Sequence, residues 1–328
     1  MGKMHFRCYK SHKNIEVVAI CDADLKQLKD TSGVKGNISG AEEKLDLSNI
    51  SLYSDLSKML AEEKLDAVSI ATPTFLHATH SIEALEAGLH VLCEKPMALN
   101  SADCLKMSAA AKHSGKILQV GHCIRFWPEY VQAKEIIDSQ KYGNVLAATF
   151  QRLSLTPTWS WDNWFLDGNR SGGAMLDLHI HDADYVQYVF GTPKAVFSQG
   201  VLGPSQDYDH CHTQYLYDNE SVITAEGGWI MSPGFGFEMS FKIMLEEATL
   251  IYSSAQEATF RIYPKDGEMV KPDIPEGDGY SFEIKHFVEH ISGKNVPSVI
   301  TPEQSADSVK IIEAEKESIR TMEKSSIS

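Results

Sequence analysis

The sequence predicts an α/β protein in which an N-terminal doubly wound parallel sheet is followed by a C-terminal α+β domain with a large, mostly antiparallel open sheet. Its 328 residues are too many for one ordinary domain. Up to about residue 122, short apolar runs alternate with helical patterns, as in parallel strands joined by crossover helices. Beyond Gly143 the apolar residues recur at every second position, which is typical of antiparallel strands. We therefore expect two domains, at residues 1–123 and 124–328.

The N-terminal part is expected to begin with a helix at residues 3–12. The strands that follow are residues 15–21, 67–72, 90–95 and 116–121, and the crossover helices between them are residues 54–64, 74–88 and 101–115. Ser54 and Ser101 are expected to cap two of these helices, and Gly88 and Gly115 to end two of them. Residues 31–50 are rich in Gly, Ser and charge, so we expect a surface excursion there.

The C-terminal part is expected to consist of a sheet and three helices. Its predicted strands are residues 145–155, 194–201, 212–218, 221–231, 235–245, 248–254 and 259–263, and its predicted helices are residues 173–190, 280–292 and 302–323. The apolar alternation predicts that one face of the sheet packs against another subunit, giving a homo-oligomer, either a dimer or a tetramer.

Composition excludes several classes of function. The 30 Lys and Arg residues against 45 Asp and Glu give a net charge of −15, which repels nucleic acid and anionic lipid surfaces. No apolar run reaches the 18 residues that a transmembrane helix needs. The six cysteines form no CxxC pair, which argues against zinc ribbons and a disulfide framework, and the first residues do not resemble a secretory signal. We expect a cytoplasmic protein.

The first residues correspond in part to a dinucleotide-binding motif. Such a motif consists of a strand, a GxGxxG turn, a helix and, about 20 residues on, an acidic residue that binds the ribose. Gly2 matches the last glycine and Asp22 matches the acidic residue. The opening strand and the first two glycines have no counterpart, which a start codon placed too far downstream would explain most simply. A chain that begins at Met1 is accordingly expected to bind a dinucleotide weakly or not at all, because the phosphate-binding turn is absent.

Two further motifs carry chemistry. Glu94-Lys95-Pro96 follows a predicted parallel strand, at the sheet edge where open α/β proteins bind ligands. In the predicted helix at residues 173–190, Asp177 and His181 lie four residues apart and share one face. A carboxylate beside an imidazole suits a general base of near-neutral pKa. A solvated lysine and a helix with an acidic N-terminal half remain the alternatives.

Aromatic residues precede the Asp177 helix and suggest a carbohydrate substrate. An indole ring stacks on the C–H face of a sugar while polar groups bind its hydroxyls, although core packing explains a single tryptophan equally well. Arg125 is a candidate for binding a substrate hydroxyl or carboxylate, with an ordinary ion pair as the alternative. The tryptophans in question are Trp127, Trp159, Trp161 and Trp164.

Taken together, four segments resemble the Gfo/Idh/MocA family, the glucose-fructose oxidoreductase and inositol dehydrogenase group. They are residues 1–5, 71–100, 120–130 and 171–191. The resemblance implies a Rossmann-type N-terminal domain and an NAD(P)-dependent dehydrogenase acting on a sugar, sugar derivative or cyclitol. It places the catalytic residues at Lys95, Asp177 and His181, and the cofactor-lining residues at Thr72, Pro73, His77 and Glu94. Many members carry a smaller residue where this chain has His179, which predicts an extra polar contact to the substrate.

These observations combine into one mechanism without a metal. His181 takes the hydroxyl proton, Lys95 stabilises the charge that develops on the same oxygen, and Asp177 orients the histidine or a neighbouring hydroxyl, while NAD takes the hydride. Asp22 should bind the ribose hydroxyls and repel a 2′-phosphate, which favours NAD over NADP. Trp159, Trp164, Arg125 and His179 are the expected substrate contacts.

Three alternatives remain open. Some members of the family use transient oxidation by bound NAD to cleave a glycosidic bond. A metal-dependent hydrolase would use the ligand types found at His179, His181, His210 and His212 with nearby aspartates, although on a helix His179 and His181 point about 200° apart. A non-catalytic protein that has lost its cofactor is the third.

Overall fold

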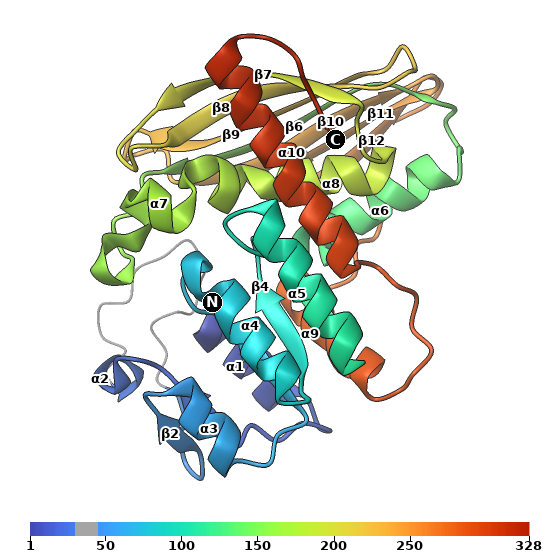
Figure 1. Cartoon of the computed structure of the whole chain (residues 1–328). Helices are drawn as coiled ribbons and strands as arrows, with labels where there is room; N and C mark the ends of the chain where they lie inside the picture. Colours follow the sequence, from blue (N-terminus) through green and yellow to red (C-terminus); the bar gives the residue numbers. More distant parts are fainter. Residues whose placement is uncertain (30–44, 328) are drawn as a thin grey trace.

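The computed structural model describes residues 1–29 and 45–327, and within them it confirms the predicted α/β architecture (Figure 1). The large sheet forms one layer, helices pack beneath it, and the parallel strands with their own helices form the remainder of the molecule. The predicted surface excursion at residues 31–50 lies mostly outside the described residues. No helix in the described ranges has the length and apolar character that a membrane span requires.

The parallel strands form two separate sheets. They are β1 (Ala19–Cys21) paired with β2 (Ser51–Tyr53), and β3 (Ala67–Ile70), β4 (His90–Glu94) and β5 (Leu118–Gly121) in the order β3-β4-β5. Within the described residues no hydrogen-bonded ladder joins β1 to β3. Strand β4 is central and buried on both faces: Leu92 packs toward Ile284 and Phe287, whereas Val91 and Cys93 belong to the main core. Such double coverage is typical of a doubly wound sheet.

The helices of the first part match predicted segments except at their caps and for the five-residue α2 (Leu25–Lys29), which was not predicted. They are α1 (Gly2–Ser11), α2 (Leu25–Lys29), α3 (Leu56–Glu62), α4 (His77–Glu86) and α5 (Ser101–Ser114). The expected caps Ser54 and Ser101 are wrong. Asp55 caps α3 by accepting from the Lys58 N–H, and Asn100 caps α5 by accepting from the Asp103 N–H, since a carboxylate or amide oxygen reaches the third N–H as well as a hydroxyl does. Gly115 ends α5 with a φ of 66°, as predicted.

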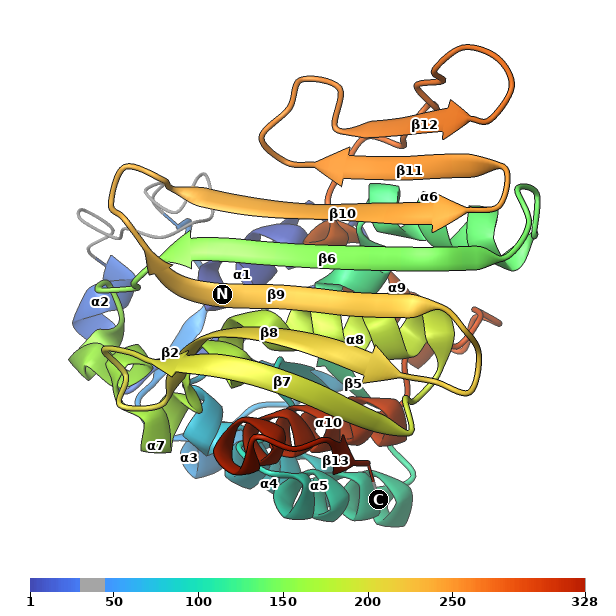
Figure 2. The same cartoon turned by 90° about the horizontal axis from the view of Figure 1, so that it is seen from above.

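The second part contains an eight-stranded sheet in the order β12-β11-β10-β6-β9-β8-β7-β13 (Figure 2). Its pairs are antiparallel except that β6 and β9 run parallel. The two-residue β13 was not predicted. The strands are β6 (Val145–Leu155), β7 (Ala195–Leu202), β8 (Tyr208–Leu216), β9 (Val222–Met231), β10 (Phe237–Leu245), β11 (Ala248–Ser253), β12 (Phe260–Pro264) and β13 (Ser325–Ser326).

Helices cover one face of this sheet. The helices of the second part are α6 (Pro128–Asp138), α7 (Gly168–Ser171), α8 (Ile180–Phe190), α9 (Gly279–Ile291) and α10 (Pro302–Thr321). Helices α6 and α7 were not predicted. Helix α9 packs against α1 and β5 of the first part and not on the large sheet. The predicted continuous helix at residues 173–190 is wrong at its start, because Met175–His179 form a π-helical segment, η4, ahead of α8. Tyr130, Phe150, Tyr185 and Phe241 form an edge-to-face aromatic core between these helices and the sheet.

Candidate active site

Lys95 and Asp177, two of the predicted catalytic residues, are in direct contact. Lys95 follows β4, and its Nζ lies 2.9 Å from Asp177 Oδ1. The same ammonium group donates to the backbone carbonyl oxygen of Asp177. The two side chains are 13% and 16% exposed, so the pair is accessible to a small molecule but mostly shielded from water. The end of a parallel strand is thereby joined to the π-helical segment η4.

His181 lies in the first turn of α8, where the charge of Lys95 influences its pKa. Burial lowers the pKa of His181 well below its ordinary value, and the positive charges of Lys95 and Arg152 lower it further. Its Nδ1 is buried and makes no hydrogen bond within the described structure. The imidazole is therefore neutral at pH 7, but in this structure it is a weaker base than the one of near-neutral pKa that the sequence predicted. The described chain contains no hydrogen bond between Asp177 and His181, because the Asp177 carboxylate binds Lys95 instead.

The π-helical segment η4 determines where the polar residues of this motif point. Its wider turns separate Asp177, which binds Lys95, from His179, which is fully buried on the sheet side. Gly172 and Gly173, with φ values of 75° and 68°, precede it and let the chain turn in from α7. Such π-helical insertions occur frequently at functional sites. The sequence pattern predicted a regular helix and gave no signal for this insertion.

His122 is a further residue of the site that the sequence analysis did not identify. It follows β5, and its Nδ1 lies 3.4 Å from Asp184 Oδ2. Burial lowers the pKa of His122 to about 4, although the Asp184 carboxylate acts against the shift. Neither ring nitrogen makes a hydrogen bond within the described chain. Its position directly after a parallel strand was the available signal, since ligand-binding residues of open α/β sheets lie there.

Glu94 anchors the strand end from which Lys95 projects. Its Oε1 lies 2.7 Å from His5 Nε2, and Ser69 Oγ lies 2.6 Å from His5 Nδ1. Burial alone would raise the pKa of Glu94, but the hydrogen bond and charge of His5, together with the charge of Lys95, lower it to about 2. The backbone N–H of Lys95 donates to Glu94 Oε2 at 3.2 Å. An ionised, fully engaged carboxylate therefore fixes the backbone beneath Lys95.

Thr72, Pro73 and His77 lie where β3 ends and α4 begins. The ring nitrogens of His77 contact the carbonyl oxygens of Pro96, at 2.7 Å, and Thr72, at 2.9 Å. This buried imidazole thus joins the loops after β3 and β4. Thr72 Oγ1 lies 3.4 Å from His80 Nδ1, and Pro73 precedes the 3₁₀ segment η1 (Thr74–Leu76). A contact between these residues and a cofactor stays a prediction.

The remaining predicted cofactor residues fit a dinucleotide in two respects. Asp22 is exposed directly after β1, and its Oδ1 accepts from the Asp24 N–H at 2.8 Å; within the described residues its second oxygen makes no hydrogen bond and is available to a ribose hydroxyl. Gly2 begins α1, and a Cβ added there would lie 3.8 Å from the Ala71 Cβ, the close helix-to-strand packing that the last glycine of the motif provides. Both assignments stay predictions.

The predicted tryptophan loop adjoins the loop that follows β3. Trp159 and Trp164 are half-buried, and Trp161 is 49% exposed. The Arg170 guanidinium carbon, on α7, lies 4.8 Å from the ring centroid of Phe75 in η1 and 5.8 Å from that of Trp161. Aromatic surface from the second part is therefore held against the carboxyl edge of the parallel strands.

Arg125 does not occupy a substrate-binding position, and the expectation for it needs correction. It is 2% exposed and lies in η2 (Cys123–Phe126), where it binds both carboxylate oxygens of Asp184 at 2.8 and 2.9 Å. Its NH1 donates to Val299 O and to Gln304 Oε1. The donors are used inside the protein, so Arg125 joins η2 to α8 and to the start of α10.

His179 is likewise not a substrate contact, because it is 0% exposed and lies 3.1 Å from Glu315 on α10. The ligand set proposed for a metal-dependent hydrolase does not assemble either. His210 and His212 project from the face of β8 opposite to Cys211, and the Asp182 and Asp184 carboxylates are occupied by Arg152 and Arg125. Successive side chains of a strand point to opposite faces of the sheet, which keeps His210 and His212 apart from the inward-facing groups.

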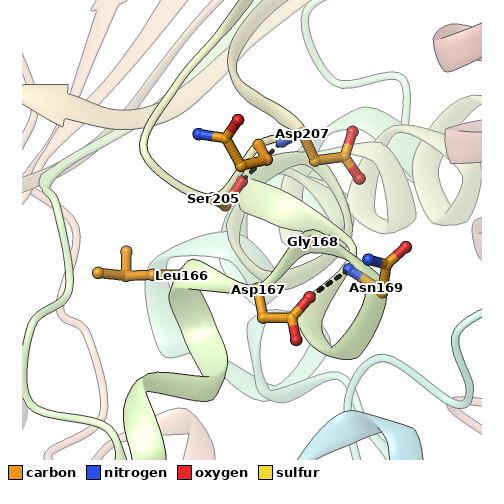
Figure 3. A pocket seen from close by; sticks show the side chains of 7 residues that line it. Leu166, Asp167, Gly168, Asn169, Ser205 and Asp207 are labelled. Carbon is orange, nitrogen blue, oxygen red and sulfur yellow. Dashed lines mark hydrogen bonds between the residues drawn. The ribbon is translucent and has the colours of Figure 1, made fainter.

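A polar hollow of about 310 Å³ lies away from these residues, beside α7 (Figure 3). Its carboxylates are already engaged: Asp167 caps α7 through the Asn169 N–H, and Asp207 forms an ion pair with Lys316. It contains none of the predicted catalytic residues. The residues lining it are Leu166, Asp167, Gly168, Asn169, Ser205, Gln206 and Asp207.

Comparison with known proteins matches both parts of the chain. Residues 1–122 match the model of an oxidoreductase family with an NAD-binding Rossmann fold, GFO_IDH_MocA, and residues 130–251 match the GFO/IDH/MocA C-terminal domain. The D-glucoside 3-dehydrogenase of Escherichia coli (strain K12) is 25% identical over 315 residues, covering 90% of this chain and 85% of the relative. The scyllo-inositol 2-dehydrogenase (NAD(+)) of Bacillus subtilis (strain 168) is 25% identical over 257 residues, covering 75% and 73%.

A solved structure of levoglucosan dehydrogenase, in complex with NADH and levoglucosan, superposes with a TM-score of 0.83. The match covers 100% of this chain and 96% of that one at 21% sequence identity. At this identity the likeness shows a shared fold.

Proposed function

Because the chain belongs to the Gfo/Idh/MocA family of NAD-binding oxidoreductases, we propose that it oxidises a secondary hydroxyl of a carbohydrate or cyclitol and transfers the hydride to NAD. The observation that carries this proposal is the contact of Lys95 with Asp177 beside a neutral His181. An ammonium group and a proton acceptor at the carboxyl edge of a parallel sheet are the groups that alcohol oxidation requires.

The chain's own residues handle the proton and the charge on the reacting oxygen. Lys95 is held by Asp177 and donates a hydrogen bond to the substrate oxygen, which stabilises negative charge as the C–H bond weakens. His181, whose imidazole is neutral, accepts the hydroxyl proton. When bound, NAD supplies the hydride acceptor, and the protein supplies position and electrostatics. The role of Asp177 is to orient Lys95. This replaces the first expectation, in which Asp177 orients the histidine.

Cofactor choice is assigned to Asp22. Its exposed carboxylate after β1 favours the two ribose hydroxyls of NAD and disfavours the 2′-phosphate of NADP by charge repulsion. The neighbouring Cys21 and Ala23 supply no positive charge in compensation.

A polyhydroxylated ring is the proposed substrate class. The names of two relatives, D-glucoside 3-dehydrogenase and scyllo-inositol 2-dehydrogenase, support this class. Independent support comes from Trp159, Trp161 and Trp164, which form aromatic surface beside the loop after β3. An aromatic ring offers a flat apolar face to the C–H groups of a sugar or cyclitol.

The six cysteine thiols are all unpaired, which supports the predicted reducing, cytoplasmic setting.

The outer face of the large sheet is assigned to self-association into a dimer or tetramer. Figure 2 shows this face turned toward the viewer, with α6 and α8 behind it. Apolar side chains are exposed on it at Phe197 and Val201 of β7, Val222 of β9 and Met244 of β10. They alternate with polar cross-strand pairs, such as Gln151 with Glu226. Mixed surfaces of this kind are common in subunit interfaces.

The test is to incubate the protein with NAD and a panel of sugars, glycosides and cyclitols while following the absorbance of the reduced cofactor. Sustained NADH formation with at least one member of the panel is expected, together with a keto product of two hydrogens fewer. Glycoside cleavage without net NADH formation would instead support the redox-assisted cleavage alternative. Absence of both activities with every compound, under conditions where NAD binds, would contradict the proposal.

A further inference from the structure

Three metal-binding side chain types converge inside the second part of the molecule. His179 of η4, Cys211 of β8 and Glu315 of α10 each place one donor atom within 4.8 Å of the other two. All three residues are 0% exposed. His179 Nε2 lies 3.1 Å from Glu315 Oε2. The cluster lies on the inner face of the sheet, separate from Lys95 and His181.

The Glu315 carboxylate lacks the partners that a buried charge needs. Neither of its oxygens makes a hydrogen bond within the described residues, and the His179 imidazole is its only ion-pair partner there. His179 Nδ1 also lacks a hydrogen bond in the described chain. A buried carboxylate is normally stabilised by several hydrogen bonds, a paired cation or a metal ion. The Tyr215 hydroxyl, whose pKa is raised by burial and by the neighbouring Glu315 carboxylate, is a second polar neighbour, so the carboxylate keeps part of its hydrogen-bonding capacity unused.

The neighbouring backbone leaves room for this arrangement. A Cβ added to Gly227 of β9 would lie 2.7 Å from both the Cβ and the Nδ1 of His179, so only glycine lets the imidazole lie against the strand. Tyr215, four residues after Cys211 on the same face of β8, places its hydroxyl 3.4 Å from His179 Nε2. An oxygen donor is thus available beside the three ligand types.

We propose that His179, Cys211 and Glu315 form a buried structural zinc site, with the Tyr215 hydroxyl or a water molecule as the fourth ligand. Imidazole, thiolate and carboxylate are the three side chain ligands that zinc takes in proteins. A thiolate favours zinc over magnesium or calcium, which prefer oxygen ligands. The thiolate and carboxylate together neutralise the two positive charges of the ion, so the low-polarity interior holds no net charge.

A metal ion at this site joins three elements on which the active site depends: η4, β8 and α10. His179 and Asp177 belong to the same segment η4, so a metal bound at His179 fixes the turn that aims Asp177 at Lys95. Glu315 ties α10 to the sheet through the same ion. Since the ligands form a complete site only when the chain is folded, metal binding adds to the stability of the native state. The sequence analysis, which expected no metal, named His179 among the ligand types of an alternative metal site but did not identify Glu315.

The first experiment measures zinc in the purified full-length protein by mass spectrometry of the elements after dialysis. We expect about one zinc per chain in the wild type, as in other closed structural sites. Cys211→Ser should lose most of this zinc. The matched control is Cys104→Ser, which replaces another fully buried cysteine, on α5, and should keep the wild-type zinc content.

The second experiment uses the wild-type chain, so its outcome does not depend on whether Cys211→Ser folds. The wild-type chain is unfolded, stripped of metal and refolded with Co²⁺, and thiolate-to-cobalt charge-transfer absorption is expected only if Cys211 binds the ion. A strong chelator present during thermal unfolding should lower the Tm of the wild type.

Two results would overturn the proposal. One is a wild-type protein that contains no metal, shows no thiolate–cobalt band and has the same Tm with and without chelator. The other is an equal zinc content in the wild type and in Cys211→Ser. In either case the cluster is a buried imidazolium–carboxylate pair, a state in which the pKa of His179 lies well above its usual range because Cys211 and Glu315 outweigh the effect of burial.

Discussion

At the scale of single residues, the sequence predicts which side chains belong to a site more readily than it predicts their contacts. The examples are Lys95, Asp177 and His181. Their residue types and spacing made all three candidates, the family resemblance placed catalytic roles on them, and the structure brings Lys95 and Asp177 together. Their contacts were not predictable in the same way. Asp177 pairs with Lys95 rather than with His181, and Arg125 and His179 turn inward to bind Asp184 and Glu315. A spacing rule says which residues share a helix face, whereas the choice of partner depends on residues far away in the chain.

Asp22 should control cofactor preference. In Asp22→Ala the carboxylate that repels the 2′-phosphate is lost, so we expect the ratio of kcat/KM with NAD to that with NADP to fall by about tenfold or more, the equivalent of about 1.4 kcal/mol. Steady-state kinetics with both cofactors measures this ratio. Asp24→Ala, two residues on, is the control. An unchanged ratio in Asp22→Ala would place the ribose elsewhere.

His122 should make the protein less stable in mild acid. Because its pKa is lowered to about 4 in the folded state, the unfolded chain binds the proton more readily between about pH 6.5 and pH 4. Stability is therefore lost as the pH falls through this window, by about 2 kcal/mol from pH 7 to pH 5 for this one group.

The corresponding measurement is the Tm of the wild type and of His122→Asn at pH 7 and pH 5. The variant cannot take up a proton at this position, so its Tm should fall less over this interval than that of the wild type. Equal falls in the two proteins would show that His122 is not the group responsible.

At the scale of secondary structure, some elements could be predicted from the sequence pattern and others could not. Strand β6 was predicted with its observed bounds, because alternation over eleven residues admits one register. Helix α6 was missed, since Pro128 at its start and the turn η2 before it resemble a loop. The segment η4 was misjudged as regular helix, because a π turn depends on the contacts of Asp177 and His179 and not on local propensity.

The Arg125–Asp184 pair should hold η2, α8 and the start of α10 together. Arg125→Leu removes one partner of a fully buried ion pair and leaves the Asp184 carboxylate without it, which typically costs about 3–5 kcal/mol. Chemical denaturation should detect this loss in the free energy of unfolding. Lys194→Ala breaks an exposed pair with Asp218 and should cost about 1 kcal/mol or less. Similar small losses in both variants would show that the buried pair contributes little.

At the scale of the whole molecule, the candidate active site lies where the three-stranded parallel sheet meets elements that pack on the eight-stranded sheet. The parallel strands contribute Lys95 and His122 from their carboxyl ends, and η4 and α8, packed on the large sheet, contribute Asp177 and His181. Alternation in the sequence predicted both sheets and their relative positions in the chain. It did not predict that β6 and β9 run parallel, or that α10 contacts both the first part and β7, because these features come from long-range packing.

The open face of the large sheet should mediate self-association. Sedimentation velocity is expected to show a species of two or four chains, and Phe197→Glu with Val201→Glu should shift it toward the 36.4 kDa monomer by placing charge in the interface. Leu105→Glu is the matched control: Leu105 is 56% exposed on α5, comparable with Val201 at 52%. A wild type that sediments as a monomer at all concentrations would refute this assignment.

The most direct test of the proposed mechanism is the turnover of Lys95→Ala and His181→Ala with NAD and the best substrate of the panel. Both variants should bind NAD as the wild type does and keep the wild-type Tm within a few degrees, yet lose about a hundredfold or more in kcat, as expected for groups that act on the transferring proton and the reacting oxygen. Lys58→Ala, which removes an exposed lysine of α3, should retain full activity. Near-wild-type turnover in Lys95→Ala or in His181→Ala would contradict the role given to that residue.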